Sequence, residues 1–466
     1  MNGGEAPAAG GRRAHLLWLI PLLALATGAL LHRAGMPAAM AITVAMTVLC
    51  AGWWIGEPVP APVTALAPIA LLPLLGVLTP VEVAQAYGND LILLLMGGFM
   101  LSKALEAQGA HRRLAFGMVR LFGGDSGGRL LLGFMAATAA CSMWISNTAT
   151  TLMMIPVALA ALERYPDPRL RLPLVLGIAY AASIGGMGTP IGTPPNLVFM
   201  RTYEQATGSA YSFLDWMQVG VPVVMVFIPL AALWLGRRLA GTPAAPLPVL
   251  GGWSPGERRV LVVFAMTALA WVTRTEPFGG WRAWLGLTQA NDASVALLAV
   301  LAMCALPDGR GGRLLRWEQA AAIPWGALIL FGGGIALATA FERSGLSAAI
   351  AGELTGLHGV PPWLLLVAVC LAMTLLSEIA SNTASAVLVM PILAAAAVAM
   401  EVDPALLMLP AAMTASCAFM LPVATAPNAV AYGSGLVTSR DMLREGAVLN
   451  AIGLAVIIAM SWLILH

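Results

Sequence analysis

Charged residues are scarce in this sequence. Only 10% of the 466 residues are charged and 59% are hydrophobic, whereas roughly a quarter of the residues in an ordinary soluble domain are charged. Apolar stretches of about 20 residues recur along the chain, and each is long enough to cross roughly 30 Å of hydrocarbon as a helix. A soluble enzyme is therefore excluded, and an all-α polytopic membrane protein is predicted.

Several other features are few or absent. The 24 Lys and Arg residues are scattered and nearly balanced by 22 Asp and Glu, which argues against binding of nucleic acid. The five cysteines lie inside apolar stretches without a C-x-x-C spacing, so neither disulfides nor zinc are predicted. No G-x-x-x-x-G-K-[ST] sequence occurs, which argues against ATP-driven pumping. No organic cofactor is predicted.

The apolar stretches predict eleven spanning segments. They are expected at residues 16–32, 38–56, 62–79, 89–107, 172–201, 218–236, 260–273, 293–307, 323–341, 405–433 and 447–465. Two further stretches, 128–160 and 362–398, each contain a Ser-Asn-Thr triplet and are predicted to be re-entrant hairpins. Backbone that leaves the helix at membrane depth is tolerated only where protein or water surrounds it.

The positions of the basic residues predict the orientation in the membrane. With the N-terminus inside, all but five of the 24 Lys and Arg residues fall on cytoplasmic ends. The five on the outside are Arg33, Arg201, Arg274, Arg282 and Arg343. We therefore expect a multi-pass protein of a cell inner membrane or plasma membrane, with the N-terminus in the cytoplasm and the C-terminus outside. The connection from Arg237 to Arg259 is predicted to link two halves.

The main functional signal is an internal repeat. The triplet Ser146-Asn147-Thr148 recurs as Ser381-Asn382-Thr383, 235 residues later, and the same offset relates Ser142 to Ser377. An odd number of predicted crossings separates the two triplets, so the halves are predicted to be inverted relative to each other. Secondary transporters are commonly built from such inverted repeats.

Each triplet is followed by a predicted break in a long apolar segment. The break in the first half is Gly192-Thr193-Pro194-Pro195-Asn196, and the corresponding segment in the second half is Ala424-Thr425-Ala426-Pro427-Asn428. The prolines remove backbone donors and interrupt the helix. An interrupted helix leaves backbone groups free for a ligand, with its N-terminal end favouring an anion and its carbonyls suiting a monovalent cation.

These motifs also have simpler interpretations. A single Ser-Asn-Thr triplet in a membrane helix usually serves helix packing, but two copies in register, each with a downstream break, favour a ligand site. Glu378, beside the second triplet, is either a functional acid or a structural partner of the hairpin backbone. An intramembrane hydrolase using Ser146 or Ser381 lacks a neighbouring base, and an ion channel does not need two ligand sites in register.

On these residues the chain resembles the divalent anion/sodium symporters, and the similarity spans nearly the whole sequence. Besides the triplets and the first break, its marks include the segment from Cys417 to Thr425. The resemblance implies an elevator-type transporter and a homodimer, in which a part holding both hairpins and both broken helices moves against a scaffold. It implies sodium ions as coupling ions and a small dicarboxylate anion as substrate.

The resemblance also implies the site residues. The first sodium site would use Ser142, Ser146, Asn147 and Gly192, and the second would use Ser377, Ala380, Asn382 and Ala424. The substrate would be bound by Ser146, Asn147, Thr148, Thr193, Ser381, Asn382, Thr383, Thr425 and Ala426. Ala426 replaces a proline that is usual in the family, which bears on the choice of anion.

The sequence therefore predicts a sodium-coupled importer of succinate, malate and fumarate that carries out no covalent chemistry. A dicarboxylate exchanger, or a tricarboxylate or sulfate carrier on the same fold, stays open as the alternative. The predicted parts are scaffold helices at 1–87, transport elements of the first repeat at 88–216, scaffold helices and linker at 217–322, transport elements of the second repeat at 323–446, and a last helix at 447–466.

Overall fold

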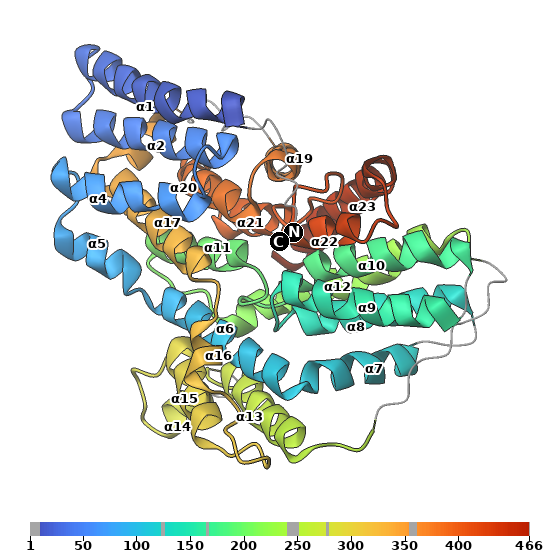
Figure 1. Ribbon diagram of the computed structural model, residues 1–466. Helices are drawn as coiled ribbons and strands as arrows, with labels where there is room; N and C mark the ends of the chain where they lie inside the picture. The colour runs from blue at the N-terminus through green and yellow to red at the C-terminus, as the bar shows by residue number, and fades with distance from the viewer. Residues whose placement is uncertain are drawn as a thin grey trace.

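A computed structural model describes residues 10–122, 126–164, 167–239, 251–275, 279–353 and 361–465. These residues form helices and connecting loops without a β-strand, which confirms the all-α prediction (Figure 1). Residues 240–250 of the predicted linker lie outside the described residues.

Helices α1 to α7 form the first part of the chain. They are α1 (Gly10–Arg33), α2 (Ala38–Gly56), α3 (Ala61–Thr64), α4 (Leu66–Leu74), α5 (Pro80–Tyr87), α6 (Asp90–Gln108) and α7 (Ala110–Phe122). Figure 1 places α1, α2, α4 and α5 along one side of the molecule. Helix α1 packs against α2, and apolar side chains of α1 such as Trp18 and Leu22 are exposed, as expected for a helix that faces lipid.

The first hairpin and the first break follow. They comprise α8 (Gly127–Ser142), α9 (Asn147–Arg164), α10 (Pro168–Gly186) and α11 (Pro194–Thr207). Helices α8, α9 and α10 lie side by side (Figure 1). Helix α10 ends at Gly186, and the next helix, α11, begins at Pro194. Its first two residues are prolines, which are tolerated there because the N–H group that proline lacks would have no acceptor within the helix. The first break thus lies where the sequence predicts it.

The middle of the chain carries α12 to α18. They are α12 (Phe213–Gly236), α13 (Pro255–Val272), α14 (Gly280–Trp284), α15 (Asp292–Ala305), α16 (Trp317–Ala321), α17 (Trp325–Arg343) and α18 (Leu346–Glu353). Helix α6 packs against α13, α15 and α16, and α17 packs against α2, α3, α4 and α5. Helix α12 instead packs against α8, α10 and α23. The division into scaffold and transport parts stays a prediction.

The last part of the chain follows the same order as the first hairpin and break. It comprises α19 (Pro362–Ile379), α20 (Asn382–Ala399), α21 (Ala405–Thr414), α22 (Ala426–Gly433) and α23 (Ser439–Leu465). Helices α19 and α20 contact each other and both pack against α21. Helix α22, which follows the second break, packs against α9 and α10 of the first half. The two halves therefore meet at their breaks and hairpins.

Seven helices of the described residues are long and apolar enough to cross a membrane. Five of them, in α1, α2, α12, α17 and α23, coincide with predicted spans, and the other two are α19 and α20 of the second predicted hairpin. The remaining predicted spans fall on helices that are shorter, interrupted or charged. The multi-pass character is confirmed, while the re-entrant topology and the inverted repeat stay predictions.

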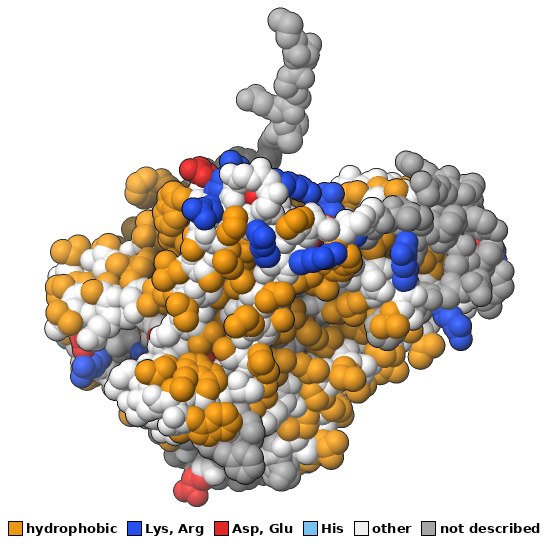
Figure 2. All heavy atoms as spheres, turned by 90° about the horizontal axis from the view of Figure 1, so that it is seen from below, with side chains coloured by type: hydrophobic (Ala, Val, Ile, Leu, Met, Phe, Trp, Pro, Cys, Tyr) orange, Lys and Arg blue, Asp and Glu red, His pale blue; other side chains and the backbone are white. Residues whose placement is uncertain are grey.

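The outer surface fits this assignment. Figure 2 shows a face with broad hydrophobic areas, with Lys and Arg side chains gathered along one margin. Exposed apolar residues on α12 and α13 include Met225, Leu233, Met266 and Leu269. Such an apolar surface is stable against hydrocarbon and would be costly in water.

Close packing of α8 and α10 depends on Gly185. A Cβ atom at this position would lie 2.3 Å from the backbone oxygen of Ala139 on α8. We expect Gly185→Ala to lower the free energy of unfolding by about 1–3 kcal/mol, because the two helices must separate. Gly128→Ala on α8 is the control, since a Cβ there meets no atom within 4 Å. Thermal unfolding in detergent measures both, and equal stability of the two variants would contradict this account.

Candidate functional site

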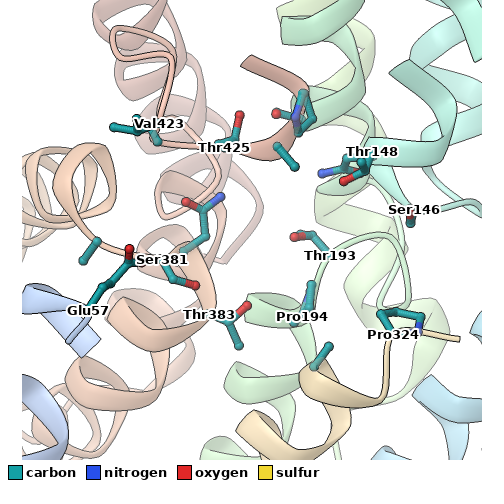
Figure 3. Close-up of a pocket in the computed structure, with 18 of the residues that line it drawn as sticks. Glu57, Ser146, Thr148, Thr193, Pro194, Pro324, Ser381, Thr383, Val423 and Thr425 are labelled. Atoms are coloured by element: carbon teal, nitrogen blue, oxygen red, sulfur yellow. The ribbon is translucent and has the colours of Figure 1, made fainter. Parts of the chain in front are cut away.

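A cavity of about 560 Å³ lies where the two hairpin tips and the two breaks meet (Figure 3). Every residue that the sequence predicts to bind substrate lines this cavity: Ser146, Asn147, Thr148, Thr193, Ser381, Asn382, Thr383, Thr425 and Ala426. Residues 235 positions apart are thus brought to opposite walls of one space. Figure 3 shows Thr148 and Thr193 on one side, and Ser381 and Thr383 on the other.

The residues of the first predicted sodium site are joined by hydrogen bonds and close packing. The Ser142 hydroxyl is fully buried and lies 2.7 Å from both Asn147 Oδ1 and the backbone oxygen of Ala182. Gly186 approaches the Asn147 amide so closely that a Cβ would lie 2.8 Å from its Oδ1. Gly192 packs against Gly186, and a Cβ at Gly192 would lie 2.4 Å from the Gly186 backbone oxygen. Hydroxyl, amide and backbone oxygens are therefore collected around the tip of the first hairpin.

The second predicted sodium site has oxygen atoms without partners. Ser377 Oγ and Asn382 Oδ1 are buried, and neither has a hydrogen-bond partner in the described residues. Ala380, Asn382 and Ala424 line the cavity, whereas Ser377 is not among its lining residues. Buried polar atoms are normally satisfied, so two unpaired oxygens on one hairpin fit a bound cation. Oxygen ligands of this kind suit a hard ion such as sodium.

Two asparagines hold the breaks in shape. Asn196 Nδ2 donates to the backbone oxygens of Gly186 at 2.9 Å and Thr189 at 2.7 Å. Asn428 Nδ2 likewise donates to the oxygens of Ala418 and Leu421, both at 2.9 Å. Each side chain thus joins two backbone carbonyls of the interrupted segment, and those of Thr189 and Leu421 also accept the N–H groups of Gly192 and Ala424. The Asn of the break motif therefore positions the loop, and the preceding Thr193 or Thr425 reaches the cavity.

Glu378 ties the second hairpin to the second break. Its carboxylate accepts hydrogen bonds from the backbone N–H of Met420 at 2.9 Å, the N–H of Leu421 at 3.1 Å and Asn450 Nδ2 at 2.7 Å. These contacts are structural, but they join the backbone of the second break and Asn450 of α23 and not, as the sequence suggested, the backbone of the hairpin itself. In the first half Met143 stands at the corresponding position, and there the Thr189 hydroxyl donates to the Met143 backbone oxygen. The hairpin is therefore joined to the break by a side-chain carboxylate in the second half and by a side-chain hydroxyl in the first half.

The electrostatics of the cavity favour an anion without basic side chains. Helices α9, α11, α20 and α22 all begin at residues of the cavity wall, so their N-terminal ends lie around one space. The N-terminal end of a helix carries positive partial charge and free N–H groups. No Lys or Arg is among the described residues that line the cavity. Binding of a divalent anion here would depend on these helix ends and on cations bound nearby.

Comparison with known proteins decides the family. The profile of a family described as citrate transporters matches residues 51–412. The sodium-dependent dicarboxylate transporter SdcS of Staphylococcus aureus is 38% identical over 96% of this chain and 90% of its own length. The chain belongs to the divalent anion/sodium symporter family. It is accordingly a transporter and not an enzyme, which confirms that prediction.

A solved structure shares the fold of this symporter-family chain. The YdaH transporter of Alcanivorax borkumensis superposes with a TM-score of 0.56 at 16% identity, covering 84% of this chain and 87% of that one. At this identity the likeness concerns the fold alone.

A second cavity, of about 710 Å³, adjoins the first and shares Phe99, Ser146, Thr148 and Pro324 with it. Its other walls carry Lys103 and Arg112. Lys103 pairs with Glu106 at 2.8 Å. Basic residues therefore stand next to the predicted site on the side expected to face the cytoplasm.

His111 also lines this second cavity. Burial lowers the pKa of its ring, and Nδ1 lies 2.9 Å from the Leu105 backbone oxygen. The ring is therefore neutral near neutral pH, so the charged groups of this wall are Arg112 and the ion pair of Lys103 with Glu106.

Sequence reasoning missed several residues of the first cavity. Ser183 on α10 and Glu57 after α2 both line it, and the Ser183 hydroxyl is buried without a partner. Neither belongs to a motif that recurs in the other half, so a search for repeats does not find them. The only available signals are a serine within an apolar stretch and an acid that directly follows one.

Proposed function

We propose that this chain is a sodium-coupled importer of C4-dicarboxylates such as succinate, malate and fumarate. The observation that carries the proposal is the single cavity in which both Ser-Asn-Thr tips and both breaks converge without a basic side chain. The named activity of SdcS, sodium-dependent dicarboxylate transport, supports it.

Sodium is proposed to supply the positive charge that the cavity walls lack. One ion is held by Ser142, Ser146, Asn147 and the backbone of Gly192, and the other by Ser377, Asn382 and the backbone of Ala380 and Ala424. The substrate carboxylates then accept hydrogen bonds from the serine, threonine and asparagine side chains of both tips. Because Asn147 and Asn382 belong to both ion and substrate sites, binding of one ligand prepares the site for the other.

Transport is proposed to occur by an elevator movement in a homodimer, with the N-terminus in the cytoplasm and the C-terminus outside. The close packing of α9 and α10 with α22, and of α11 with α20 and α21, supports movement of both hairpins and both breaks as one unit. Seven apolar helices and the apolar outer face support a multi-pass location in a cell inner membrane or plasma membrane.

Coupling of sodium and substrate can be tested by binding alone. By thermodynamic linkage, sodium must raise the affinity for succinate by the same factor by which succinate raises the affinity for sodium. Isothermal titration of the purified chain with succinate, in sodium and in choline, measures this factor. We expect binding only in sodium. Equal affinity in both salts would contradict sodium coupling.

Ala426 is expected to influence which anions are accepted. It is the exposed first residue of α22 and lines the cavity, at the position that Pro194 occupies in α11. A proline is tolerated at this helix position, so Ala426→Pro should leave the fold intact and fill part of the cavity. We expect bulky anions to inhibit succinate uptake about two- to tenfold less strongly, relative to small ones, than they do in wild type. An unchanged order would remove Ala426 from the selectivity of the site.

A further inference from the structure

Glu57 is the only ionisable side chain among the described residues that line the substrate cavity. It follows α2, in a part of the chain predicted to be scaffold, and Figure 3 shows it on the side of the cavity where Ser381 lies. Its side chain is exposed, and within the described residues its carboxylate has no hydrogen-bond or ion-pair partner. A cavity suited to anions thus carries one unpaired negative charge.

The backbone at Glu57 is unusual for this residue type. Glu57 adopts the left-handed conformation, with φ 47° and ψ 44°, and its N–H donates to the Trp53 backbone oxygen to end α2. Glycine is the usual residue here because side chains are disfavoured at positive φ. Among the described non-glycine residues only Glu57 and Glu401 have positive φ. Glu57 therefore stands at a helix end where termination alone would favour glycine.

We propose that Glu57 selects the transported anion by its charge, disfavouring trivalent carboxylates relative to divalent ones. This inference rests on the proposed function and adds a specificity determinant to it. With one sodium ion in each of the two proposed sites, the bound ions and a dicarboxylate together carry no net charge, and Glu57 faces a neutral set of ligands. A tricarboxylate leaves one uncompensated negative charge, which Glu57 repels across the cavity.

The neighbouring cavity makes such a selector useful. Lys103 and Arg112 line the second cavity together with Glu106, which pairs with Lys103, so Arg112 is the basic residue of this wall that is left to attract anions of either valence. These basic residues do not discriminate between anions by valence. Glu57 instead lines the substrate cavity, which also contains the hairpin tips.

The test compares two competitors that differ mainly in one charge. Tricarballylate is a trianion at mildly alkaline pH, and ethylsuccinate is a dianion with a methyl group in place of one terminal carboxylate, so that both keep a succinate unit. Each competes with sodium-driven uptake of radiolabelled succinate into proteoliposomes that contain the full chain. We expect wild type to favour ethylsuccinate, and Glu57→Gln to reduce this preference by about three- to tenfold, since the charge is partly solvated.

Two further variants separate charge from backbone effects. Glu57→Gly removes the charge and relieves the positive φ, and should show the same reduced preference as Glu57→Gln. Glu401→Gln changes the other glutamate with positive φ, which is exposed between α20 and α21, and should keep the wild-type preference. If a Glu57 variant does not support uptake, competition is measured as displacement of succinate from the purified protein.

The outcomes are distinct from those of the proposed function. A preference unchanged in Glu57→Gln, or both competitors shifting by the same factor, would overturn the role of Glu57 while sodium-driven uptake by wild type stands. Uptake by wild type that ignores sodium would instead contradict the proposed function itself.

Discussion

Replacing Asn382 with alanine is expected to reduce sodium-driven succinate uptake by at least about a hundredfold, and Asn147→Ala should do the same. Each amide is proposed to contact both a sodium ion and the substrate. Hydrogen bonds to charged partners contribute about 1.5–3 kcal/mol each, so the loss of two such contacts accounts for this factor. The unpaired Oδ1 of Asn382 shows that its removal breaks no existing contact of that atom. Radiolabelled uptake per inserted protein is the measurement.

Asn291→Ala is the matched control for these variants. Asn291 caps α15, where its Oδ1 accepts from the Ser294 N–H at 2.8 Å, and it does not line the substrate cavity. Loss of a cap costs about 1 kcal/mol of stability, but uptake per folded protein should stay at the wild-type level. Near-normal uptake by Asn147→Ala or Asn382→Ala would show that the site is assigned wrongly.

Glu378→Ala is expected to cause the largest loss of stability among the polar substitutions considered. The carboxylate is 3% exposed and accepts from the N–H groups of Met420 and Leu421 and from Asn450. Its removal leaves one buried and two partly buried donors without an acceptor, at a cost of about 3–5 kcal/mol. Because the loop after Met420 leads to Ala424 and Thr425, transport should be lost as well. Thermal unfolding and uptake are measured together.

Glu378→Gln tests the same contact more gently. It keeps one oxygen and the size of the side chain, but its amide nitrogen cannot accept a hydrogen bond. We expect stability between wild type and Glu378→Ala, with a higher sodium concentration needed for half-maximal uptake. A Glu378→Ala protein as stable as wild type would contradict the structural role of this residue.

The cavity could be predicted from sequence because its chemistry recurs. Ser146-Asn147-Thr148 and Ser381-Asn382-Thr383 share one register, and each is followed by a Pro-Asn break. Repetition makes polar residues in apolar segments recognisable as a site, and the fold places both copies around one space. Glu378 was predicted as a candidate with two roles, and its three hydrogen bonds are structural, although they join the second break and α23 and not the hairpin backbone.

Residues without a counterpart in the other half could not be found in this way. Glu57 follows a long apolar helix and resembles an ordinary loop residue in sequence, since only the packing of α2 brings it to the cavity. Ser183 lies in α10 among small and apolar residues, and only the packing of that helix brings it to the cavity. Such placements depend on tertiary packing, which local sequence does not encode.

The measurement that tests the central claim most directly is uptake of radiolabelled succinate into proteoliposomes with an inward gradient of sodium or of choline. We expect succinate to accumulate inside the vesicles above its external concentration only with sodium, and malate and fumarate to compete with this uptake. Uptake of equal rate in choline, or uptake that requires dicarboxylate already inside the vesicles and ignores sodium, would contradict a sodium-coupled importer.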